Sequence, residues 1–249
     1  MILHQEGSIK IFFGDARHKF FPTQLKQNKE LLEEKRLVEQ EPFKEIAQLI
    51  SSVHLIFLHQ VHGTEGLVIS DSADIPSHAF SYPGDFLITQ RSSLGLALAA
   101  ADCLPIIFYD PYNNVIAIAH AGWRGSVAGV AHKTLEKMRT IYGTSPQDLK
   151  IFFGPSAKKC CYRVGEELQQ SVVAHDYGAS TLSWPLTKGD MTFFDLPLFN
   201  QLQLMECGVP SSAFITDYNL CTICDLSFCS YRRQQQEGSR QITVVTIQY

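Results

Sequence analysis

The chain alternates short apolar runs with amphipathic and charged stretches, and both patterns predict regular elements. Three apolar runs, at residues 86–89, 94–100 and 105–109, are too apolar to have a face in water, which is typical of buried strands. The Asp-Pro-Tyr-Asn-Asn segment at 110–114 predicts a turn, so the run at 115–119 returns as the second strand of a hairpin. The other predicted strands are residues 9–13, 55–58, 149–153, 213–216 and 242–247.

Helical spacing occupies the stretches between these strands. After Gly125, apolar residues recur every three or four positions until Gly143, which predicts an amphipathic helix ended by that glycine. Because strands and helices alternate imperfectly, and no Gly-x-Gly-x-x-Gly or Walker sequence occurs, we expect a fold of the α+β or α/β class, with mixed sheets covered by helices. We expect it to form one compact domain over residues 1–249. The remaining predicted helices are residues 25–41, 43–50, 165–175 and 196–207.

Composition and charge limit the classes of binding partner and indicate the cellular compartment. A net charge of -4 and a pI near 6.1 argue against nucleic acid as a partner, because such binders need a cationic surface. The most apolar stretch, residues 94–109, contains Asp102 and Pro105 and is not a membrane span. No basic segment followed by an apolar run opens the chain, and its seven cysteines are an odd number, so we expect reduced thiols in a cytoplasmic protein without a membrane partner.

The chemistry concentrates in three segments that place metal-competent or nucleophilic side chains beside a glycine or a proline. The predicted hairpin brings Cys103 and His120 together, because Cys103 precedes the outgoing strand and His120 ends the returning one. With His62 they offer two imidazoles and one thiolate, the ligand set of a catalytic zinc whose fourth position stays open. The segments are His-Gln-Val-His-Gly at 59–63, Ala-Asp-Cys-Leu-Pro at 101–105 and His-Ala-Gly-Trp-Arg-Gly at 120–125.

The same residues allow other interpretations. Cys103 is also a candidate nucleophile with His120 as its base, an arrangement that needs no metal but leaves His62 without a task. The alternative without a catalytic role is that Cys103 is a buried cysteine of a sheet and that His62 and His120 are surface histidines with hydrogen-bond partners. His59 is the candidate for a fourth ligand, which would close the site and make it structural.

Two places supply cations for an anionic substrate. Arg124 and the N–H groups near residues 125–126, at the start of the predicted helix, suit phosphate. The alternative is that Arg124 is a surface charge and Trp123 fills the core. Arg232 and Arg233 are a second pair that suits phosphate or carboxylate if it lies near a pocket.

The remaining thiols form two short groups. Cys221 and Cys224 are spaced Cys-x-x-Cys, with Cys229 close behind, a pattern that suggests a second zinc site or a redox site. Because no fourth ligand follows at zinc-finger spacing, we interpret them as structural cysteines. The adjacent Cys160 and Cys161 are interpreted as packing residues in the same way.

Five motifs in this order resemble those of the YfiH/LACC family, with a match from about residue 55 to residue 233. They are the three segments above, Gly-Pro-Ser at 154–156 with Cys-Tyr-Arg-Val-Gly at 161–165, and Ser-Tyr-Arg-Arg at 230–233. The family carries the labels multicopper polyphenol oxidoreductase (laccase), purine nucleoside phosphorylase and peptidoglycan-editing factor. The chain departs from the family before the first motif, where only Asn28-Lys29 corresponds to the family's Asn-Arg pair, which belongs to the wall of the pocket.

The resemblance implies a single α/β domain with a catalytic zinc on His62, Cys103 and His120. It also implies phosphorolysis of purine nucleosides (adenosine, inosine and methylthioadenosine) to base and ribose 1-phosphate, together with adenosine deamination. A zinc ion with a free coordination position suits deamination, because the metal lowers the pKa of bound water. Nucleoside and phosphate are then the expected small-molecule partners, with Arg124 as the candidate phosphate ligand.

The other labels lead to alternative functions. A laccase needs several coppers, whose imidazole ligands come in His-x-His pairs, whereas this chain has nine histidines and no His-x-His. Copper is therefore less favoured than zinc, and polyphenol oxidation is the least favoured activity. The runners-up are a cytosolic peptidoglycan-editing factor of amidase type and a hydrolase that uses Cys103 and His120.

Overall fold

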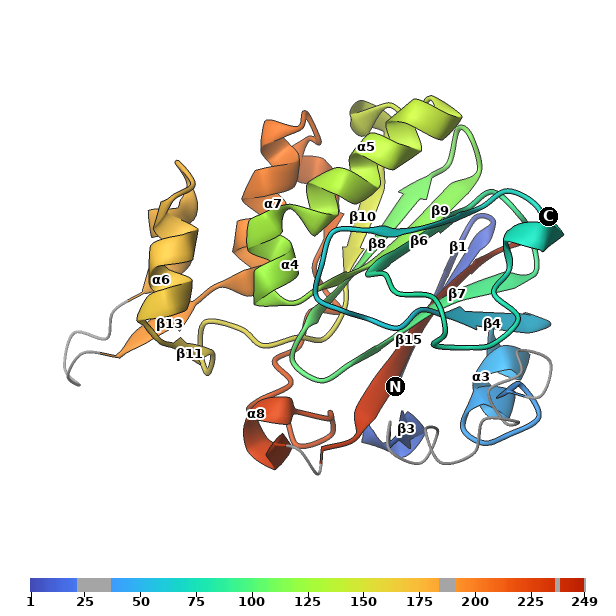
Figure 1. The fold of residues 1–249 in the computed structure, drawn as a ribbon, viewed down its shortest axis with the longest axis horizontal. Helices are drawn as coiled ribbons and strands as arrows, with labels where there is room; N and C mark the ends of the chain where they lie inside the picture. The colour runs from blue at the N-terminus through green and yellow to red at the C-terminus, as the bar shows by residue number, and fades with distance from the viewer. Residues whose placement is uncertain (22–36, 184–190, 236–237, 249) are drawn as a thin grey trace.

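The computed structural model describes residues 1–21, 37–183, 191–235 and 238–248, and it arranges them as stacked sheets and helices (Figure 1). Most of the helix predicted at 25–41 lies outside the described residues, as does the pair at 28–29. The described strands form two six-stranded sheets and one three-stranded sheet.

The first sheet has the order β1-β2-β15-β7-β4, and β3 also pairs with β15. Its neighbours are antiparallel except for β4 and β7, which are parallel. This sheet therefore joins the two ends of the chain to its middle, with β15 beside β2 and β7. Its strands are β1 (Ile2–Glu6), β2 (Ile9–Phe13), β3 (Lys19–Phe20), β4 (His54–Phe57), β7 (Leu94–Ala100) and β15 (Arg240–Ile247).

The second sheet has the order β14-β10-β8-β9-β6-β5. Its centre is the predicted hairpin, in which Asp110 pairs with Val115 beside the turn and Leu104 pairs with Ala121 at the far end. The strands are β5 (Gly66–Ile69), β6 (Phe86–Thr89), β8 (Leu104–Asp110), β9 (Val115–Ala121), β10 (Lys150–Phe153) and β14 (Phe214–Ile215). The small third sheet comprises β11 (Arg163–Val164), β13 (Thr192–Phe194) and β12 (Leu182–Ser183).

The helices α3, α4, α5 and α7 lie on the outer faces of the two large sheets. In Figure 1, α4, α5 and α7 lie together on one side of the molecule and α3 lies on the other. The α-helices are α3 (Phe43–Leu49), α4 (Trp123–Ala128), α5 (Val130–Tyr142), α6 (Glu166–Val173), α7 (Leu196–Glu206) and α8 (Tyr231–Gln234). The 3-10 turns are η1 (Ala16–His18), η3 (Ser72–Asp74), η4 (Pro146–Asp148), η5 (Gly178–Thr181) and η6 (Ser211–Ala213).

Alternation along the strands assigns each buried side chain to a layer. On β8, Leu104, Ile106 and Phe108 pack on the helix side, whereas Ile107 and Tyr109 face the first sheet. This follows from the two-residue period of a strand, and both faces are covered, as the continuous apolar runs predict. The layers are therefore helices, second sheet, first sheet and α3.

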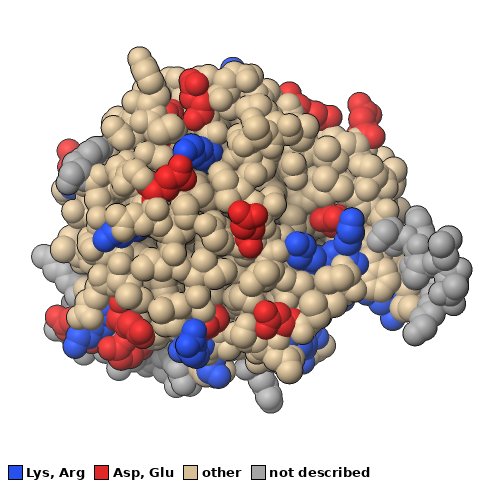
Figure 2. Space-filling view, turned by 180° about the vertical axis from the view of Figure 1, so that it is seen from behind, with Lys and Arg blue, Asp and Glu red and all other residues tan. Residues whose placement is uncertain are grey.

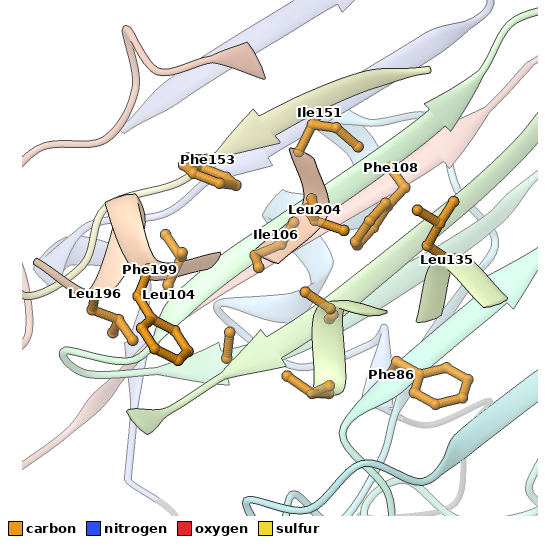
Figure 3. Packing of buried hydrophobic residues seen from close by; sticks show 14 of the residues in the cluster. Phe86, Leu104, Ile106, Phe108, Leu135, Ile151, Phe153, Leu196, Phe199 and Leu204 are labelled. Atoms are coloured by element: carbon orange, nitrogen blue, oxygen red, sulfur yellow. The ribbon is translucent and has the colours of Figure 1, made fainter. Parts of the chain in front are cut away.

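The largest core cluster lies between the second sheet and its helices. Figure 3 shows Ile106 and Phe108 of β8 beside Leu204 of α7, with Leu135 of α5 covering the same face. These side chains are buried, and fully burying one such side chain contributes about 1.5–3 kcal/mol. The packing fixes β8, which begins directly after Cys103, and β9, which carries His120.

The predicted fold class, mixed sheets covered by helices, is confirmed. One difference is the helix after Gly125, which begins earlier, at Trp123, and is divided into α4 and α5 at Gly129. Gly129 has a φ of 93°, a left-handed conformation that glycine adopts without steric cost. A second difference is β1, which the apolar pattern missed because every other residue of this edge strand is exposed.

The surface charge is mixed on the face turned away from Figure 1. Figure 2 shows lysines and arginines interspersed with acidic side chains there. Such a surface differs from the continuous basic face that nucleic-acid binding uses. Among the helices of the described residues, none combines the length and the apolar character needed to cross a membrane.

Candidate metal site and its cavity

His62 lies in a loop after β4 that one buried carboxylate organises. Asp85 Oδ2 accepts hydrogen bonds from the N–H groups of Val61 (3.2 Å) and Gly63 (2.7 Å), and Oδ1 accepts one from the N–H of His62 (3.0 Å). His62 has a φ of 60°, which costs free energy for a residue with a Cβ. Asp85 therefore holds His62 in a conformation that a free loop would rarely adopt.

The side chain of Gln60 connects the same loop to the first sheet. Its Nε2 donates to the Ala99 carbonyl (2.8 Å), and its Oε1 accepts from the Ala99 N–H (2.9 Å). The amide thereby pairs with a backbone position of β7 as a neighbouring strand would. The His62 loop is thus connected to both sheets, through Asp85 and through Gln60.

Cys103 lies in the turn between β7 and β8, next to a second organising carboxylate. Asp102 has a φ of 82°, and its carboxylate accepts hydrogen bonds from Thr222 Oγ1 (2.7 Å), Ser230 Oγ (3.0 Å) and the Arg232 N–H (2.7 Å). These donors come from a segment far along the chain. The turn that presents Cys103 therefore depends on the C-terminal loop.

His120 is buried near the end of β9, and its ring orientation is fixed by Asp85. Its Nδ1 lies 2.8 Å from Asp85 Oδ1, so Nδ1 donates to the carboxylate and Nε2 is the ring nitrogen that remains for a metal. A carboxylate behind a histidine is the usual support of a metal-ligating imidazole.

The ligand atoms of His62, Cys103 and His120 all lie within 4.8 Å of one another, and His62 Nε2 is 3.8 Å from Cys103 Sγ. Zinc bonds of about 2.0 Å to nitrogen and 2.3 Å to sulfur place such atoms about 3.5 Å apart in a tetrahedron. Gly122 allows this approach, because a Cβ there would lie 2.7 Å from His62 Cδ2 and 3.0 Å from Cys103 Sγ. The donor set and spacing fit zinc.

The predicted meeting of Cys103 and His120 is confirmed, and His62 joins them. His59 lines the same cavity but does not belong to this cluster of described residues, so the idea of a fourth protein ligand from His59 is wrong. The backbone explains the difference, because the N–H and carbonyl of His59 pair with the 82–84 segment, ahead of the turn that aims His62 at the cluster. A metal ion held by the three side chains of the cluster would keep a fourth position open.

Cys103 and His120 change each other's pKa. Burial raises the pKa of the Cys103 thiol, but the charge and hydrogen bond of His120 and the hydrogen bond of His62 outweigh it, and the net pKa is lowered to about 6. Burial lowers the pKa of His120, whereas Cys103 and Asp85 raise it, to about 9. Cys103 is therefore a thiolate near neutral pH, the form that binds metals and also the form that attacks electrophiles.

The cluster opens into a cavity of about 870 Å³, within the range of small-molecule sites. The lining of this cavity combines apolar rings with guanidinium groups. The rings belong to Phe20, Phe80, Trp123, Tyr162 and Tyr231, and the guanidinium groups to Arg124, Arg232 and Arg240. Flat rings stack with flat ligands, and arginines bind anions, so the wall suits a heterocycle joined or adjacent to a charged group.

Arg124 lies in the cavity wall, but the predicted anion site at its helix start is not formed as expected. Because α4 begins at Trp123, the N–H of Ser126 donates to the Gly122 carbonyl (2.8 Å) and is not available to a ligand. The Arg124 guanidinium lies over the Trp123 ring, 4.1 Å from its centroid, and pairs with Glu167 at 3.2 Å. Trp123 lines the cavity and also packs against the core.

The two neighbouring arginines have different roles. Arg232 lines the cavity, with its guanidinium 5.1 Å from the centroid of Tyr162. Arg233 instead donates to the backbone carbonyls of Ile223 and Asp225, at 3.3 and 3.2 Å, and so holds a loop together. Only the first of this pair faces the cavity.

Asp85, Asp102 and Arg240 are parts of the site that the sequence motifs did not identify. Asp85 follows a Pro-Gly pair and directly precedes an apolar strand, the same pattern of a polar residue at a strand end that identified His120. Arg240 carried no comparable signal. The structure also brings the thiols of Cys160 and Cys161, which the sequence analysis interpreted as packing residues, close to those of Cys221 and Cys224.

The fold and the cluster define a class of mixed α/β protein with an open His-Cys-His site between two sheets. The family model described as multi-copper polyphenol oxidoreductase laccase matches residues 30–248, and the chain belongs to that family. This confirms the resemblance to the YfiH/LACC family.

Relatives and solved structures agree with this assignment. Purine nucleoside phosphorylase YlmD of Geobacillus stearothermophilus is 32% identical over 191 residues, covering 75% of this chain and 69% of that protein. The purine nucleoside phosphorylase of Bacteroides thetaiotaomicron is 31% identical over 201 residues, covering 78% and 73%. The structure of the Bacillus licheniformis hypothetical protein YfiH has a TM-score of 0.74 and 27% identity, covering 82% of this chain and 79% of that one. Neisseria meningitidis protein NMB0706, at 19% identity and a TM-score of 0.74, shares the fold over 100% of this chain and 99% of its own.

Proposed function

We propose that this protein is a zinc-dependent purine nucleoside phosphorylase that also deaminates adenosine. The observation that carries the proposal is the open His62, Cys103 and His120 cluster at the wall of a cavity with aromatic and cationic lining. Relatives about 30% identical to the chain are named purine nucleoside phosphorylases, which supports the same reaction class here.

The cluster supports zinc as the metal and His62, Cys103 and His120 as its ligands. When bound, zinc would act as a Lewis acid and lower the pKa of a coordinated water. Copper is less favoured, because one thiolate and two imidazoles form a single site, whereas polyphenol oxidation by a laccase needs several coppers. Asp85 is a positioning residue that keeps His120 Nε2 free to coordinate the metal.

The cavity supplies binding groups for both substrates of phosphorolysis. A phosphate oxygen attacks C1′ of the ribose, the bond from C1′ to the purine nitrogen breaks, and the base leaves with that electron pair and takes up a proton. Tyr162 and Trp123 offer faces for the base, and Arg124 offers a charge for the phosphate. In deamination water replaces the amino group of adenosine and ammonia leaves, so phosphate has no part.

One observation favours a second candidate, a hydrolase with Cys103 as nucleophile and His120 as its acid and base. The lowered pKa of Cys103 provides a thiolate near neutral pH without a metal. The two candidates differ in their response to metal removal, which abolishes the phosphorylase activity and leaves a thiol hydrolase active.

A panel of adenosine, inosine and methylthioadenosine, each with and without phosphate, tests the proposal. The zinc-loaded protein should release base only with phosphate, and should form inosine from adenosine with or without it. Absence of both activities in zinc-loaded wild type contradicts the proposal. Because its substrates are free metabolites, we propose a cytoplasmic location. We also propose that residues 1–249 form one catalytic domain.

A further inference from the structure

Four thiols from two distant loops gather outside the site described above. Cys160 and Cys161 lie after β10, and Cys221 and Cys224 lie in the loop before α8. Their sulfur atoms are all within 4.8 Å of one another, and Cys160 Sγ is 4.0 Å from Cys224 Sγ. Each pair on its own is an incomplete ligand set, and the fold combines the two pairs into one.

The sulfur spacing fits a single metal ion. Zinc–sulfur bonds of about 2.3 Å place the sulfur atoms of a tetrahedron about 3.8 Å apart. A disulfide instead requires about 2.05 Å between sulfurs, and all four cysteines are free. Thiolate sets of this kind select zinc or iron among the common metals.

The backbone around the thiols is held in place by hydrogen bonds between the two loops. Ser156 and Cys221 form an isolated parallel bridge, in which the Ser156 N–H donates to the Leu220 carbonyl and the Thr222 N–H donates to the Ser156 carbonyl, both at 3.0 Å. The Asn219 side chain donates to Ser156 Oγ at 2.9 Å. The two cysteine pairs therefore face each other across a preformed scaffold.

The lysines that lie near the four thiols are engaged elsewhere. Lys158 Nζ donates to the Asn219 carbonyl at 2.8 Å, and Lys159 Nζ pairs with Asp195 at 3.5 Å. The cation that would balance several thiolates is therefore not one of these lysines.

We propose that Cys160, Cys161, Cys221 and Cys224 bind a zinc ion in a closed tetrathiolate site. With four protein ligands, no position remains for water or substrate, so the role is structural. The ion joins the loop that carries Tyr162 to the loop that carries Thr222 and leads into α8, which carries Arg232. These residues line the cavity or hold Asp102, and the second site thus positions the cavity wall without taking part in the reaction.

Metal content of the full-length protein, purified without added metal, tests the proposal by stoichiometry. Wild type should contain two zinc ions per chain, and Cys224→Ser should lose one of them. Cys207→Ser is the matched control, because Cys207 is a partly buried thiol in neither cluster, and it should retain both. Wild type with only the zinc that Cys103→Ala removes overturns the proposal.

A spectroscopic measurement keeps the test independent of how well Cys224→Ser folds. X-ray absorption of the Cys103→Ala protein, in which only the tetrathiolate zinc remains, should show four sulfur neighbours at about 2.3 Å and no imidazole. Nitrogen ligands, iron in place of zinc, or disulfides among the four cysteines in a mass spectrum of the unreduced protein would overturn the assignment.

Discussion

Asp85→Asn tests how the site is held, because it removes one charge and keeps the size of the side chain. Asp85 Oδ1 lies 2.8 Å from His120 Nδ1 and 3.0 Å from the His62 N–H, and Oδ2 serves Val61 and Gly63. An amide has only one oxygen, so its NH₂ group must face donors on one side or the other.

Both orientations of the asparagine weaken the site. If its NH₂ faces His120, Nδ1 must become the acceptor and the ring proton moves to Nε2, the atom needed for the metal. If it faces the backbone N–H groups, buried donors lose their partner, which costs about 1–3 kcal/mol in stability. Loss of such a supporting carboxylate lowers metal affinity by about 10–100-fold, or about 1.4–2.7 kcal/mol.

The assay is a zinc titration against a competing chelator, performed on Cys224→Ser protein so that only the His-Cys-His site contributes. Asp85→Asn should bind zinc at least tenfold more weakly in this background. Asp74→Asn is the matched control, because Asp74 accepts the N–H groups of Ser70 and Asp71 on the surface, away from the site. Unchanged zinc affinity in folded Asp85→Asn would refute the reasoning.

Three further outcomes follow from the structure. Gly122→Ala should weaken zinc binding in the same titration, since its Cβ would lie 2.7 Å from the His62 ring and 3.0 Å from the Cys103 sulfur; wild-type affinity would contradict this. Arg124→Ala should lower the rate of phosphorolysis more than that of adenosine deamination, and equal losses would show that its charge does not serve phosphate. Burial raises the pKa of Asp15, but hydrogen bonds from Arg17 and from the N-terminal amino group outweigh burial and hold the pKa well below 3.8. The carboxylate therefore stabilises the fold above about pH 4 and loses this effect as the pH falls further, so Asp15→Asn should flatten the acid side of a plot of Tm against pH.

The sequence predicted the parts of the fold that local patterns determine. The turn at 110–114 identified the β8–β9 hairpin, and with it the approach of Cys103 to His120, because the two strands are neighbours in the chain. The contribution of His62 from another sheet was not a local property and came from the ligand chemistry and the family resemblance. The edge strand β1 was missed, since its alternating exposure removes the apolar run that marks a buried strand.

The parts that the sequence did not predict depend on contacts between distant segments. Asp85 forms hydrogen bonds with both His62 and His120 only because β6 lies beside β9 and the His62 loop folds over the start of β6. The thiol cluster depends on the bridge between Ser156 and Cys221, which no spacing within either loop indicates. In the sequence, each of the two cysteine pairs therefore resembles ordinary packing cysteines.

The most direct test of the central claim is the rate of hypoxanthine release from inosine with phosphate, measured on one wild-type preparation before metal removal, after it, and after zinc is returned. We predict that removal lowers the rate by about 100-fold or more and that zinc restores it, because the metal contributes several kcal/mol to the transition state. A zinc-loaded, folded protein that releases no base, or a metal-free protein that retains the full rate, would contradict the account.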